Sequence, residues 1–249
     1  MKNLRNKVAL VTGGSRGIGA SISRALAEDG AYVFVNYFSN KSAAEETIGE
    51  IRKLNGQAEA IQTDVGNSDQ VRSMFEQITT KFNGIDIVVN NAGIVNFKPS
   101  PIVDATDEYV AGIFNINTNG TLRCLREAAK CIRHGGRIIN ISSYATKSLY
   151  SNYSIYAASK AAVEALTIVL SKELKGRGVT VNCIAPDAIA TDDWLNGKSQ
   201  EIISTVSKLS PMERLGVPID VASVVRFLAT SQAEWINGQV LYLNGGSIL

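Results

Sequence analysis

Short apolar runs alternate with longer amphipathic segments along almost the whole chain. The runs are rich in valine and isoleucine and do not alternate strictly between apolar and polar residues, which is typical of parallel strands covered by helices on both faces. They predict strands at residues 8–11, 31–36, 58–62, 85–90, 137–142, 179–185 and 240–243. The segments between them follow a helical period, and they predict helices at residues 15–29, 42–54, 71–81, 108–131, 154–174 and 219–228.

The order of these elements indicates the fold class. Strand and helix alternate from one end to the other, and no linker, repeat or change of composition divides the 249 residues. We therefore expect one α/β domain over residues 1–249, a Rossmann-type, doubly wound parallel sheet of about seven strands with helices on both faces. Residues 188–215 are less regular and form either a substrate lid or an ordinary surface insertion.

Composition and charge exclude several classes of function. Hydrophobic residues make up 45% of the chain, enough for a large core. The formal net charge of +2, from 25 basic and 23 acidic residues, gives no electrostatic footprint for nucleic acid. No stretch reaches the roughly 18 unbroken apolar residues of a membrane span, so we expect a cytoplasmic protein without a membrane anchor. Three cysteines without metal-ligand spacing and a single histidine, His134, in a turn predict no metal site.

A glycine-rich loop follows the first predicted strand. Its glycines would permit a tight turn, close approach of the backbone to a pyrophosphate, and close packing of the next helix. The free N–H groups at the start of that helix would then face the phosphates of a dinucleotide. The loop predicts cofactor contacts from Gly13, Ser15, Arg16, Gly17, Ile18 and Gly19.

The end of the second predicted strand bears on the choice between NAD and NADP. An acidic residue there would accept hydrogen bonds from the ribose hydroxyls and repel a 2′-phosphate. This strand instead ends in Asn36 and continues to Ser39 and Lys41 without a carboxylate. Arg16 and Lys41 could both face a phosphate dianion, although Lys41 could equally be a solvated residue at a helix start. We expect NADP(H) to be preferred, with NAD(H) as the alternative.

Tyr156 and Lys160 are four residues apart at the start of a predicted helix, so their side chains share a face. A lysine cation about 4 Å from a phenol, at an effective dielectric near 20, would stabilise the phenolate by roughly 4 kcal/mol before screening. That would lower the pKa of the tyrosine by as much as about 3, into the working range of a general acid or base. By itself such a pair is more often a surface pair, so the neighbouring motifs have to decide.

Two further motifs stand at the carboxyl ends of predicted strands, where parallel sheets of this kind bind ligands. Ser143 follows the fifth predicted strand, and Asn91, Ala92 and Gly93 follow the fourth. These positions bring polar groups from separate parts of the chain toward the edge of the sheet at which the glycine loop lies.

The motifs form a set that spans the chain. They are the glycine loop, Asp64 and Val65, the Asn90-Asn-Ala-Gly93 segment, Asn117, Ser143 and Tyr156-Ala-Ala-Ser-Lys160. Together they resemble the single-domain short-chain dehydrogenase/reductase family, and the match runs essentially end to end. The sequence is similar to members such as 3-oxoacyl-acyl-carrier-protein reductases and NADPH-dependent aldehyde reductases.

The resemblance implies hydride transfer between a nicotinamide and a carbonyl compound. Tyr156 would protonate the carbonyl oxygen, and Ser143 would hydrogen-bond that oxygen. Lys160 would hold the nicotinamide ribose and tune Tyr156, while Asn117 would hold a water that resupplies the proton. Further cofactor contacts are implied for Asn36, Ser39, Asp64, Val65, Asn91, Ala92, Gly93, Tyr156, Lys160, Pro186, Ile189 and Thr191. One position departs from the family pattern: Asp187 stands where glycine usually follows the proline, and it would add negative charge near the nicotinamide.

The expected activity is that of an NADPH-dependent carbonyl reductase, an oxidoreductase acting on CH–OH groups, with a 3-oxoacyl thioester or a small carbonyl compound as substrate. Quinones and cyclic ketones stay open as substrates, and Lys147 and Lys198 near the site could receive an acyl-carrier protein. Aromatic residues near the motifs are the expected pocket walls: Phe97, Tyr144, Tyr150, Tyr153 and Trp194.

Three other functions compete with this one. An NAD-dependent alcohol or sugar dehydrogenase would run the same chemistry in the oxidative direction. A cofactor-sensing protein without catalysis would have lost Tyr156 or Lys160, and both are present. A sugar-nucleotide epimerase would need a larger C-terminal region. The apolar faces of the predicted helices 108–131 and 154–174 suit a homotetramer or homodimer, or alternatively burial within the same chain.

Overall fold

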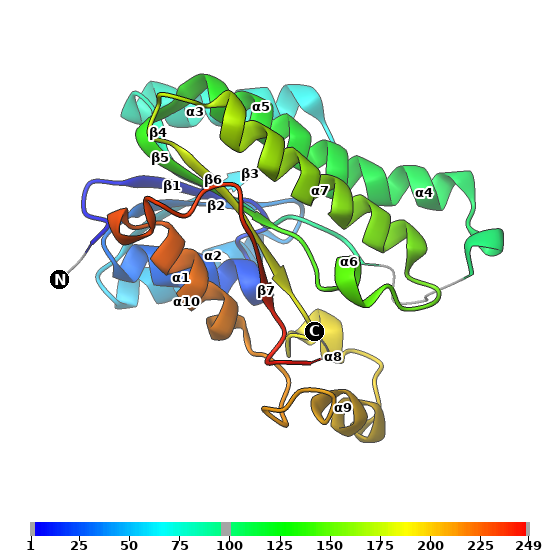
Figure 1. Cartoon of the computed structure of the whole chain (residues 1–249). Helices are drawn as coiled ribbons and strands as arrows, with labels where there is room; N and C mark the ends of the chain where they lie inside the picture. The colour runs from blue at the N-terminus through cyan, green and yellow to red at the C-terminus, as the bar shows by residue number, and fades with distance from the viewer. Residues whose placement is uncertain (1–2, 96–100, 248–249) are drawn as a thin grey trace.

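The computed structural model describes residues 3–95 and 101–247, and its centre is a seven-stranded parallel sheet (Figure 1). The strands are β1 (Val8–Val11), β2 (Tyr32–Tyr37), β3 (Gln57–Gln62), β4 (Ile85–Asn90), β5 (Ile132–Ile141), β6 (Thr180–Pro186) and β7 (Val240–Leu243). Their order is β3-β2-β1-β4-β5-β6-β7, so the chain builds one half of the sheet outward from β1 and the other half outward from β4. The predicted doubly wound sheet is confirmed, and the point where the winding reverses lies between β1 and β4.

Helices cover both faces of this sheet (Figure 1). One layer holds α1 (Gly17–Glu28), α2 (Lys41–Lys53) and α10 (Pro218–Leu228). The other holds α3 (Ser68–Phe82), α4 (Asp107–Phe114), α5 (Thr121–Cys131) and α7 (Ser154–Glu173). Each layer buries its own apolar cluster against the strands, which explains why the strand residues are apolar on both faces. Short elements complete the described chain: η1 (Ile102–Asp104), η2 (Asn115–Gly120), α6 (Ala145–Ser148), α8 (Asp192–Leu195), α9 (Gln200–Ser207) and η3 (Ser231–Ala233).

The long helix predicted for residues 108–131 is confirmed in extent but is not one uniform α-helix. The chain is helical throughout, but α4 and α5 are separated by η2, one widened turn of π-helix with the sequence Asn-Ile-Asn-Thr-Asn-Gly. Asparagine and glycine are weak helix formers, and a side chain holds the widened turn: the Arg123 guanidinium donates to the carbonyl oxygen of Asn115 at 3.1 Å and to its Oδ1 at 3.0 Å. Such widened turns often mark functional sites.

β5 begins earlier than predicted, at Ile132 rather than at residue 137. Ile132 pairs with Ile85, and the register then shifts so that Arg137 pairs with Ile87. The irregularity contains Gly135, whose φ of 73° lies in the left-handed region that glycine adopts easily. The hydrophobic pattern therefore predicts a strand that begins only after this interruption, whereas the backbone pairing extends across it.

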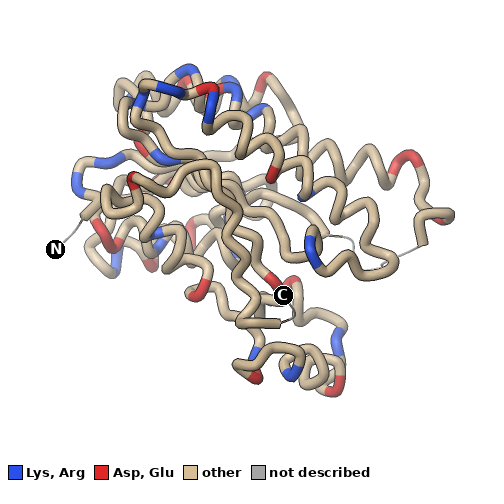
Figure 2. The backbone as a smooth tube through the Cα atoms, in the orientation of Figure 1, with Lys and Arg blue, Asp and Glu red and all other residues tan. Residues whose placement is uncertain are grey.

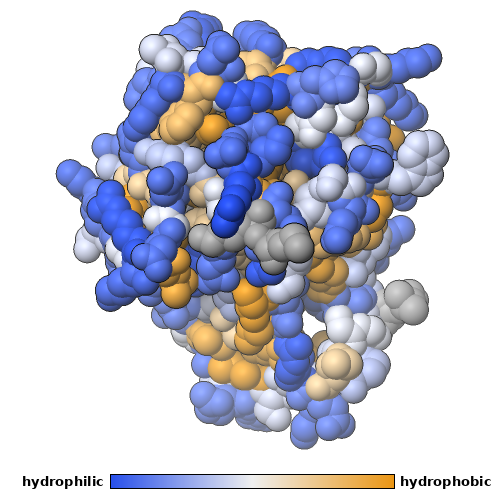
Figure 3. Space-filling view, turned by 90° about the vertical axis from the view of Figure 1, so that its left-hand side faces the viewer, coloured by the Kyte–Doolittle hydropathy of each residue, from blue (hydrophilic) through white to orange (hydrophobic). Residues whose placement is uncertain are grey.

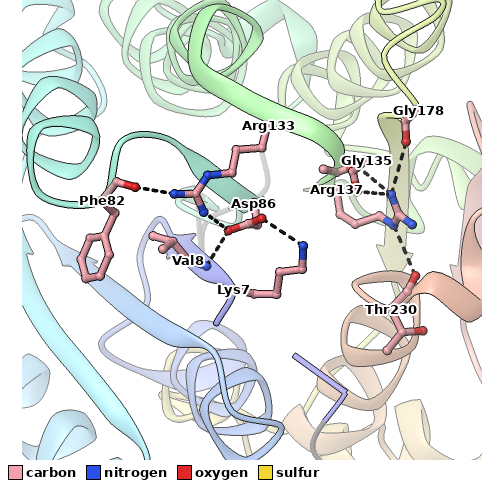
Figure 4. A network of polar contacts seen from close by, with 10 residues as sticks. Lys7, Val8, Phe82, Asp86, Arg133, Gly135, Arg137, Gly178 and Thr230 are labelled. Atoms are coloured by element: carbon pink, nitrogen blue, oxygen red, sulfur yellow. Dashed lines mark hydrogen bonds and ion pairs between the residues drawn. The ribbon is translucent and has the colours of Figure 1, made fainter. Parts of the chain in front are cut away.

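Charged residues fasten the amino ends of the strands, at the opposite edge from the glycine loop (Figure 4). The buried carboxylate of Asp86 accepts from Lys7 Nζ at 3.1 Å, from the Val8 N–H at 2.9 Å and from Arg133 at 2.5 Å. The guanidinium of the buried Arg137 donates to four backbone carbonyl oxygens, those of Gly135, Gly136, Gly178 and Thr230. Among the described residues, it has no side-chain acceptor. These contacts satisfy polar groups inside the fold and contribute no ligand-binding chemistry.

The surface carries charges of both signs. Figure 2 shows lysine, arginine, aspartate and glutamate spread over both helical layers, and Figure 3 shows a mostly hydrophilic face with apolar side chains in patches between polar ones. In the described residues, α7 alone is long and apolar enough to cross a membrane by length and composition. It lies against β5 and β6.

Candidate active site

Two adjoining hollows lie at the carboxyl ends of the strands. One is a groove of about 540 Å³ along the glycine loop and the ends of β1, β2 and β4. The other is a cavity of about 1010 Å³ between the end of β7, α6 and the segment 188–215. Ser143 and Tyr156 line both hollows, so the two side chains that the sequence predicts to touch the carbonyl oxygen stand where groove and cavity meet.

The glycine loop has the geometry of a dinucleotide cradle. Gly13 and Gly17 have φ of 59° and 52°, in the left-handed region. A Cβ atom on Gly19 would lie 2.1 Å from the carbonyl oxygen of Gly13, so no other residue fits there without displacing the loop. The first turn of α1 therefore opens directly onto the groove, with its free N–H groups and positive dipole end placed for phosphates.

The loop is joined to its neighbours by side chains from β1 and β4. Thr12 Oγ1 accepts from the N–H groups of Asn91 and Ala92, both at 3.0 Å. Asn91 Nδ2 in turn donates to the carbonyl oxygens of Thr12 and Gly13, again at 3.0 Å. The two strand ends at the switch point thus hold one another, and the glycine turn is held with them.

Asn36 at the end of β2 is buried and holds the same turn. Its Oδ1 accepts from the Gly13 N–H at 3.0 Å, and its Nδ2 donates to the carbonyl oxygens of Ile61 and Thr63 at 3.2 Å. The amide therefore has a positioning role at the place where an aspartate would select NAD. Within the described residues, no carboxylate lies at the end of β2 that could repel a 2′-phosphate.

Every residue predicted to contact the cofactor lines the groove; that each touches a bound cofactor stays a prediction. Lys41 is different, because it is the exposed first residue of α2 and does not line the groove. Arg16 does line it and forms an ion pair with Asp193 of α8, with Nη1 and Oδ1 3.3 Å apart and both side chains largely exposed. Residues that the sequence did not single out also line it, among them Tyr37, Phe38, Asn40, Thr63, Ile94 and Val95.

The predicted Tyr–Lys pair comes together on α7, but its electrostatics differ from the expectation. Lys160 Nζ lies 6.0 Å from the centroid of the Tyr156 ring and donates to the carbonyl oxygen of Ile141 at 3.0 Å. Burial raises the pKa of Tyr156, and a hydrogen bond with Ser143 acts in the opposite direction. The predicted lowering of that pKa by Lys160 is wrong for the protein alone, because desolvation outweighs a cation at this distance. A protonated phenol is the form that can donate a proton to a carbonyl oxygen.

Burial disfavours the charged form of Lys160. Desolvation lowers the pKa of its ammonium group from 10.5 to about 8, and its side chain is almost wholly shielded from solvent. Gly93 lies against it, since a Cβ atom there would be 3.1 Å from Lys160 Nζ and 3.3 Å from Asn117 Oδ1. The loop after β4 can approach these two side chains closely only because that position has no side chain of its own.

This burial predicts a gain of stability on removing the charge. At neutral pH the folded protein holds a lysine cation whose depressed pKa opposes folding by about 3 kcal/mol. Lys160→Met keeps the length of the side chain and removes the cation, so we expect its Tm to exceed that of the wild type by several degrees at pH near 7. The gain should shrink as pH rises from about 8 to 10.5, because the wild-type lysine then becomes neutral in both states. A lower Tm at neutral pH would contradict this account.

Asn117 lies in η2 and is fully buried. Its Oδ1 accepts from the Ile94 N–H at 2.8 Å, and its Nδ2 donates to the Ile94 carbonyl oxygen at 2.9 Å and to Ser159 Oγ at 3.1 Å. Both donors of the amide are thus used within the protein. The side chain holds the segment after β4 against α7, and its predicted part in holding a water stays a prediction.

The cavity has the walls expected of a substrate site, with two differences. Tyr150, Tyr153 and Trp194 line it as predicted. Tyr144 instead is buried with its ring edge-on to Tyr242 at a centroid distance of 6.1 Å, and Tyr242 lines the cavity. Phe97 falls outside the described residues. The segment 188–215 supplies one apolar wall, chiefly through Ile189, Ile202, Val206, Leu209 and Met212.

Within residues 3–95 and 101–247, no group of three or more His, Cys, Asp or Glu side chains is placed to hold a metal ion. The site therefore consists of a glycine loop, a phenol, a hydroxyl and a buried ammonium at one edge of the sheet.

A family model described as Enoyl-(Acyl carrier protein) reductase matches residues 13–247 of the chain. A short-chain type dehydrogenase/reductase of Picea abies is 42% identical over 98% of this chain and 93% of its own length.

The chain belongs to the short-chain dehydrogenase/reductase family.

Two further relatives bear on the cofactor. A protein of Arabidopsis thaliana named NADPH-dependent aldehyde reductase-like is 41% identical over 98% of this chain and 95% of its own length. The crystal structure of a short chain dehydrogenase from Burkholderia cenocepacia in complex with NADP has a TM-score of 0.92 at 34% identity, covering 98% of this chain and 99% of that one. The reductase described here is accordingly an NAD(P)-dependent oxidoreductase acting on CH–OH or carbonyl groups, with NADP(H) as the supported cofactor.

Arg16 is the side chain expected to distinguish the two cofactors. Its ion pair with Asp193 is exposed, and such pairs contribute only about 0–1 kcal/mol, so Arg16 can exchange it for a 2′-phosphate. We expect Arg16→Ala to weaken NADPH binding about tenfold more than NADH binding, the scale of a hydrogen bond to a charged group. Titrations of both cofactors by fluorescence measure this, with Lys41→Ala as a control that should change neither. Equal losses for NADPH and NADH would show that Arg16 does not touch the 2′-phosphate.

Proposed function

We propose that this reductase transfers hydride from NADPH to the carbonyl group of a bulky, uncharged ketone or aldehyde. The observation that carries the proposal is the cavity of about 1010 Å³ next to Ser143 and Tyr156. Its volume is at the upper end of the range of small-molecule sites and exceeds what a small aldehyde would fill. Its walls are mainly aromatic and aliphatic, which favours a substrate with an apolar body.

The residues at the junction supply the proton chemistry. NADPH bound in the groove would supply the hydride. The Ser143 hydroxyl and the Tyr156 phenol already hydrogen-bond each other, so both can converge on one carbonyl oxygen. Tyr156 donates its proton as negative charge develops on that oxygen, and Ser143 stabilises the same charge. The Lys160 ammonium, with Nζ 6.0 Å from the centroid of the Tyr156 ring, lines the groove and would hold the nicotinamide ribose.

The charge of the cavity argues for a neutral substrate. Asp187, which departs from the family pattern, lines both hollows, and its Oδ2 accepts from Ser247 Oγ at 2.6 Å. No ion pair with a basic side chain is found for it in the described part of the chain. Its charge also contributes to a raised pKa at Tyr150, after burial. Lys198, Arg214 and Asp220 also line the cavity, so its ionised side chains sum to no net positive charge that would attract an anion. A carboxylate or phosphate held beside Asp187 would be repelled.

A 3-oxoacyl thioester on a carrier protein is the second candidate. The rim of the site carries two lysines that an acidic carrier could meet: Lys198, which lines the cavity, and the exposed Lys147, whose Nζ lies 5.4 Å from the centroid of the Tyr242 ring. The family model that matches residues 13–247 carries the description Enoyl-(Acyl carrier protein) reductase. The apolar wall of the segment 188–215, which we propose to act as a lid, could also receive an acyl chain.

A substrate panel tests the proposal. Purified protein is given NADPH or NADH with a polycyclic ketone, an aromatic aldehyde, a quinone, a 3-oxoacyl thioester, and a carboxylated analogue of the aromatic aldehyde. We expect the fastest turnover with NADPH and a bulky neutral carbonyl, and the slowest with the carboxylated analogue. Oxidation of the corresponding alcohols with NAD as the faster direction would favour the dehydrogenase function. Tight NADPH binding without turnover on any member would favour a cofactor-sensing protein.

We also propose that the protein is a homo-oligomer, as a homotetramer or homodimer, through the layer that contains α5 and α7. Apolar side chains on these helices are exposed in the single chain: Leu122, Ile168 and Val169. A helix as apolar as α7 that is left partly uncovered is typical of a subunit contact. Light scattering after size-exclusion chromatography measures the state directly, and a monomer at micromolar concentration would contradict the proposal.

A further inference from the structure

The half-buried carboxylate of Glu164, next to the active site, has no part in the reaction described above. Glu164 lies on α7, one helical turn after Lys160 and two turns after Tyr156, so the three side chains follow one face of the helix. It is half-buried and lines neither the groove nor the cavity. Its contacts instead reach the segment that carries Ser143.

Glu164 Oε1 accepts two hydrogen bonds from residues on either side of Ser143. Ser142 Oγ and Thr146 Oγ1 both lie 2.8 Å from this oxygen. Thr146 Oγ1 is also 3.0 Å from the carbonyl oxygen of Ser143, and Ser142 Oγ is 3.2 Å from that of Lys160. Hydrogen bonds to an ionised acceptor are roughly twice as strong as neutral ones. One oxygen on α7 therefore holds the chain on both sides of the catalytic hydroxyl.

The second carboxylate oxygen faces another element of the site. Tyr242 of β7 places its hydroxyl 3.5 Å from Glu164 Oε2, and its ring packs edge-on against Tyr144. α6, which follows Ser143, packs against α7 (Figure 1). The carboxylate thus joins the end of β5, the start of α6, α7 and β7 at one point.

This arrangement bears on catalysis because Ser143 and Tyr156 come from different elements. Tyr156 is fixed by α7, whereas Ser143 sits on the connection between β5 and α6, a helix of only four residues. The hydrogen bond between them requires the connection to stay at one distance from α7. A displacement on the scale of 1 Å in such a group can cost about a hundredfold in rate.

We propose that Glu164 is a positioning residue for the reductase reaction, which holds Ser143 at hydrogen-bonding distance from Tyr156 through Ser142 and Thr146. The inference rests on the proposed function, since it concerns the two residues that would contact the carbonyl oxygen. It adds a carboxylate that contacts neither substrate nor cofactor.

A double-mutant cycle tests this on the full-length enzyme. Glu164→Ala should lower kcat about tenfold, the scale of coupling within one hydrogen-bond network, with NADPH affinity unchanged. Glu164→Gln keeps an oxygen that can accept from both hydroxyls and should stay near the wild-type rate. In the Ser143→Ala background, Glu164→Ala should have no further effect. Glu173→Ala, at the exposed end of the same helix, is the matched control and should be silent.

Three outcomes would overturn the inference while leaving the reductase function intact. The first is a wild-type kcat in Glu164→Ala, and the second is the same loss with and without Ser143. The third is a loss in Glu164→Gln as large as in Glu164→Ala. If the wild-type protein shows no turnover, the result counts against the proposed function instead. The role of Glu164 can then still be tested without a substrate, through the pKa of Tyr156. Because the Ser143 hydrogen bond lowers the pKa of Tyr156, Glu164→Ala should raise it, measured by ultraviolet titration as the difference from the Tyr156→Phe counterpart. An unchanged Tyr156 pKa would contradict the inference.

Discussion

Tyr156→Phe is expected to lower kcat by at least about a hundredfold, the lower end of what a positioned general acid contributes, and to leave NADPH affinity nearly unchanged. The ring stays in place at the junction of groove and cavity, so packing is preserved. The lost hydroxyl is the proposed proton donor, and it lines both groove and cavity beside Ser143. Steady-state rates with the best substrate of the panel, together with NADPH titration by fluorescence, measure both quantities.

A neighbouring tyrosine provides the control for this variant. Tyr153 also lines the cavity and lies close enough to influence the pKa of Tyr156, yet it is not placed at the groove. Tyr153→Phe should change KM more than kcat. If Tyr156→Phe kept most of the wild-type rate, or if both variants lost kcat equally, Tyr156 would not be the acid.

Gly19→Ala is expected to weaken NADPH binding by about a hundredfold or more. Its methyl group would lie 2.1 Å from the Gly13 carbonyl oxygen and 2.6 Å from Asn91 Nδ2. Both neighbours belong to the network that holds the glycine loop, so the backbone has to move where the pyrophosphate would lie. Overpacking of this kind costs about 1–3 kcal/mol or more. Fluorescence titration with NADPH measures the loss, and circular dichroism verifies that the variant is folded.

The matched control is a glycine whose methyl group would meet nothing. Gly49 lies within α2, and a Cβ atom there has no heavy atom within 4 Å. Gly49→Ala should bind NADPH as the wild type does and should be more stable by up to about 1 kcal/mol, because alanine favours the helix interior. Undiminished NADPH binding by Gly19→Ala would show that the loop can move without loss of the cofactor site.

The elements that the sequence predicts correctly are those that local residues determine. The strands, their parallel order and the glycine loop were predictable because they depend on residues near one another in the chain. A run of valine and isoleucine indicates a covered strand wherever it occurs, and Gly13 and Gly17 are needed for a local backbone conformation. Tyr156 and Lys160 were found in the same way, from a helical spacing and a resemblance carried by short motifs.

The errors arose where distant segments decide the outcome. The hydrophobic period alone predicts an unbroken helix over residues 108–131, whereas Asn117 in the widened turn η2 is hydrogen-bonded to Ile94 in the segment after β4. Tyr144 was expected in the cavity and is buried against Tyr242, some hundred positions away along the chain. Glu164 gave no signal at all, since nothing local marks a carboxylate as the partner of Ser142 and Thr146.

The sequence by itself determined the fold class, the family, the glycine loop and the side chains proposed for catalysis. Only the tertiary structure decided the direction in which the pKa of Tyr156 is moved, the size and charge of the substrate cavity, and the attachment of Ser143 to α7. The physical reason is that pKa values and cavity walls depend on burial and on groups brought together across the sheet. Spacing shows which side chains share a helix face, whereas desolvation of Tyr156 and Lys160 depends on everything that packs around them.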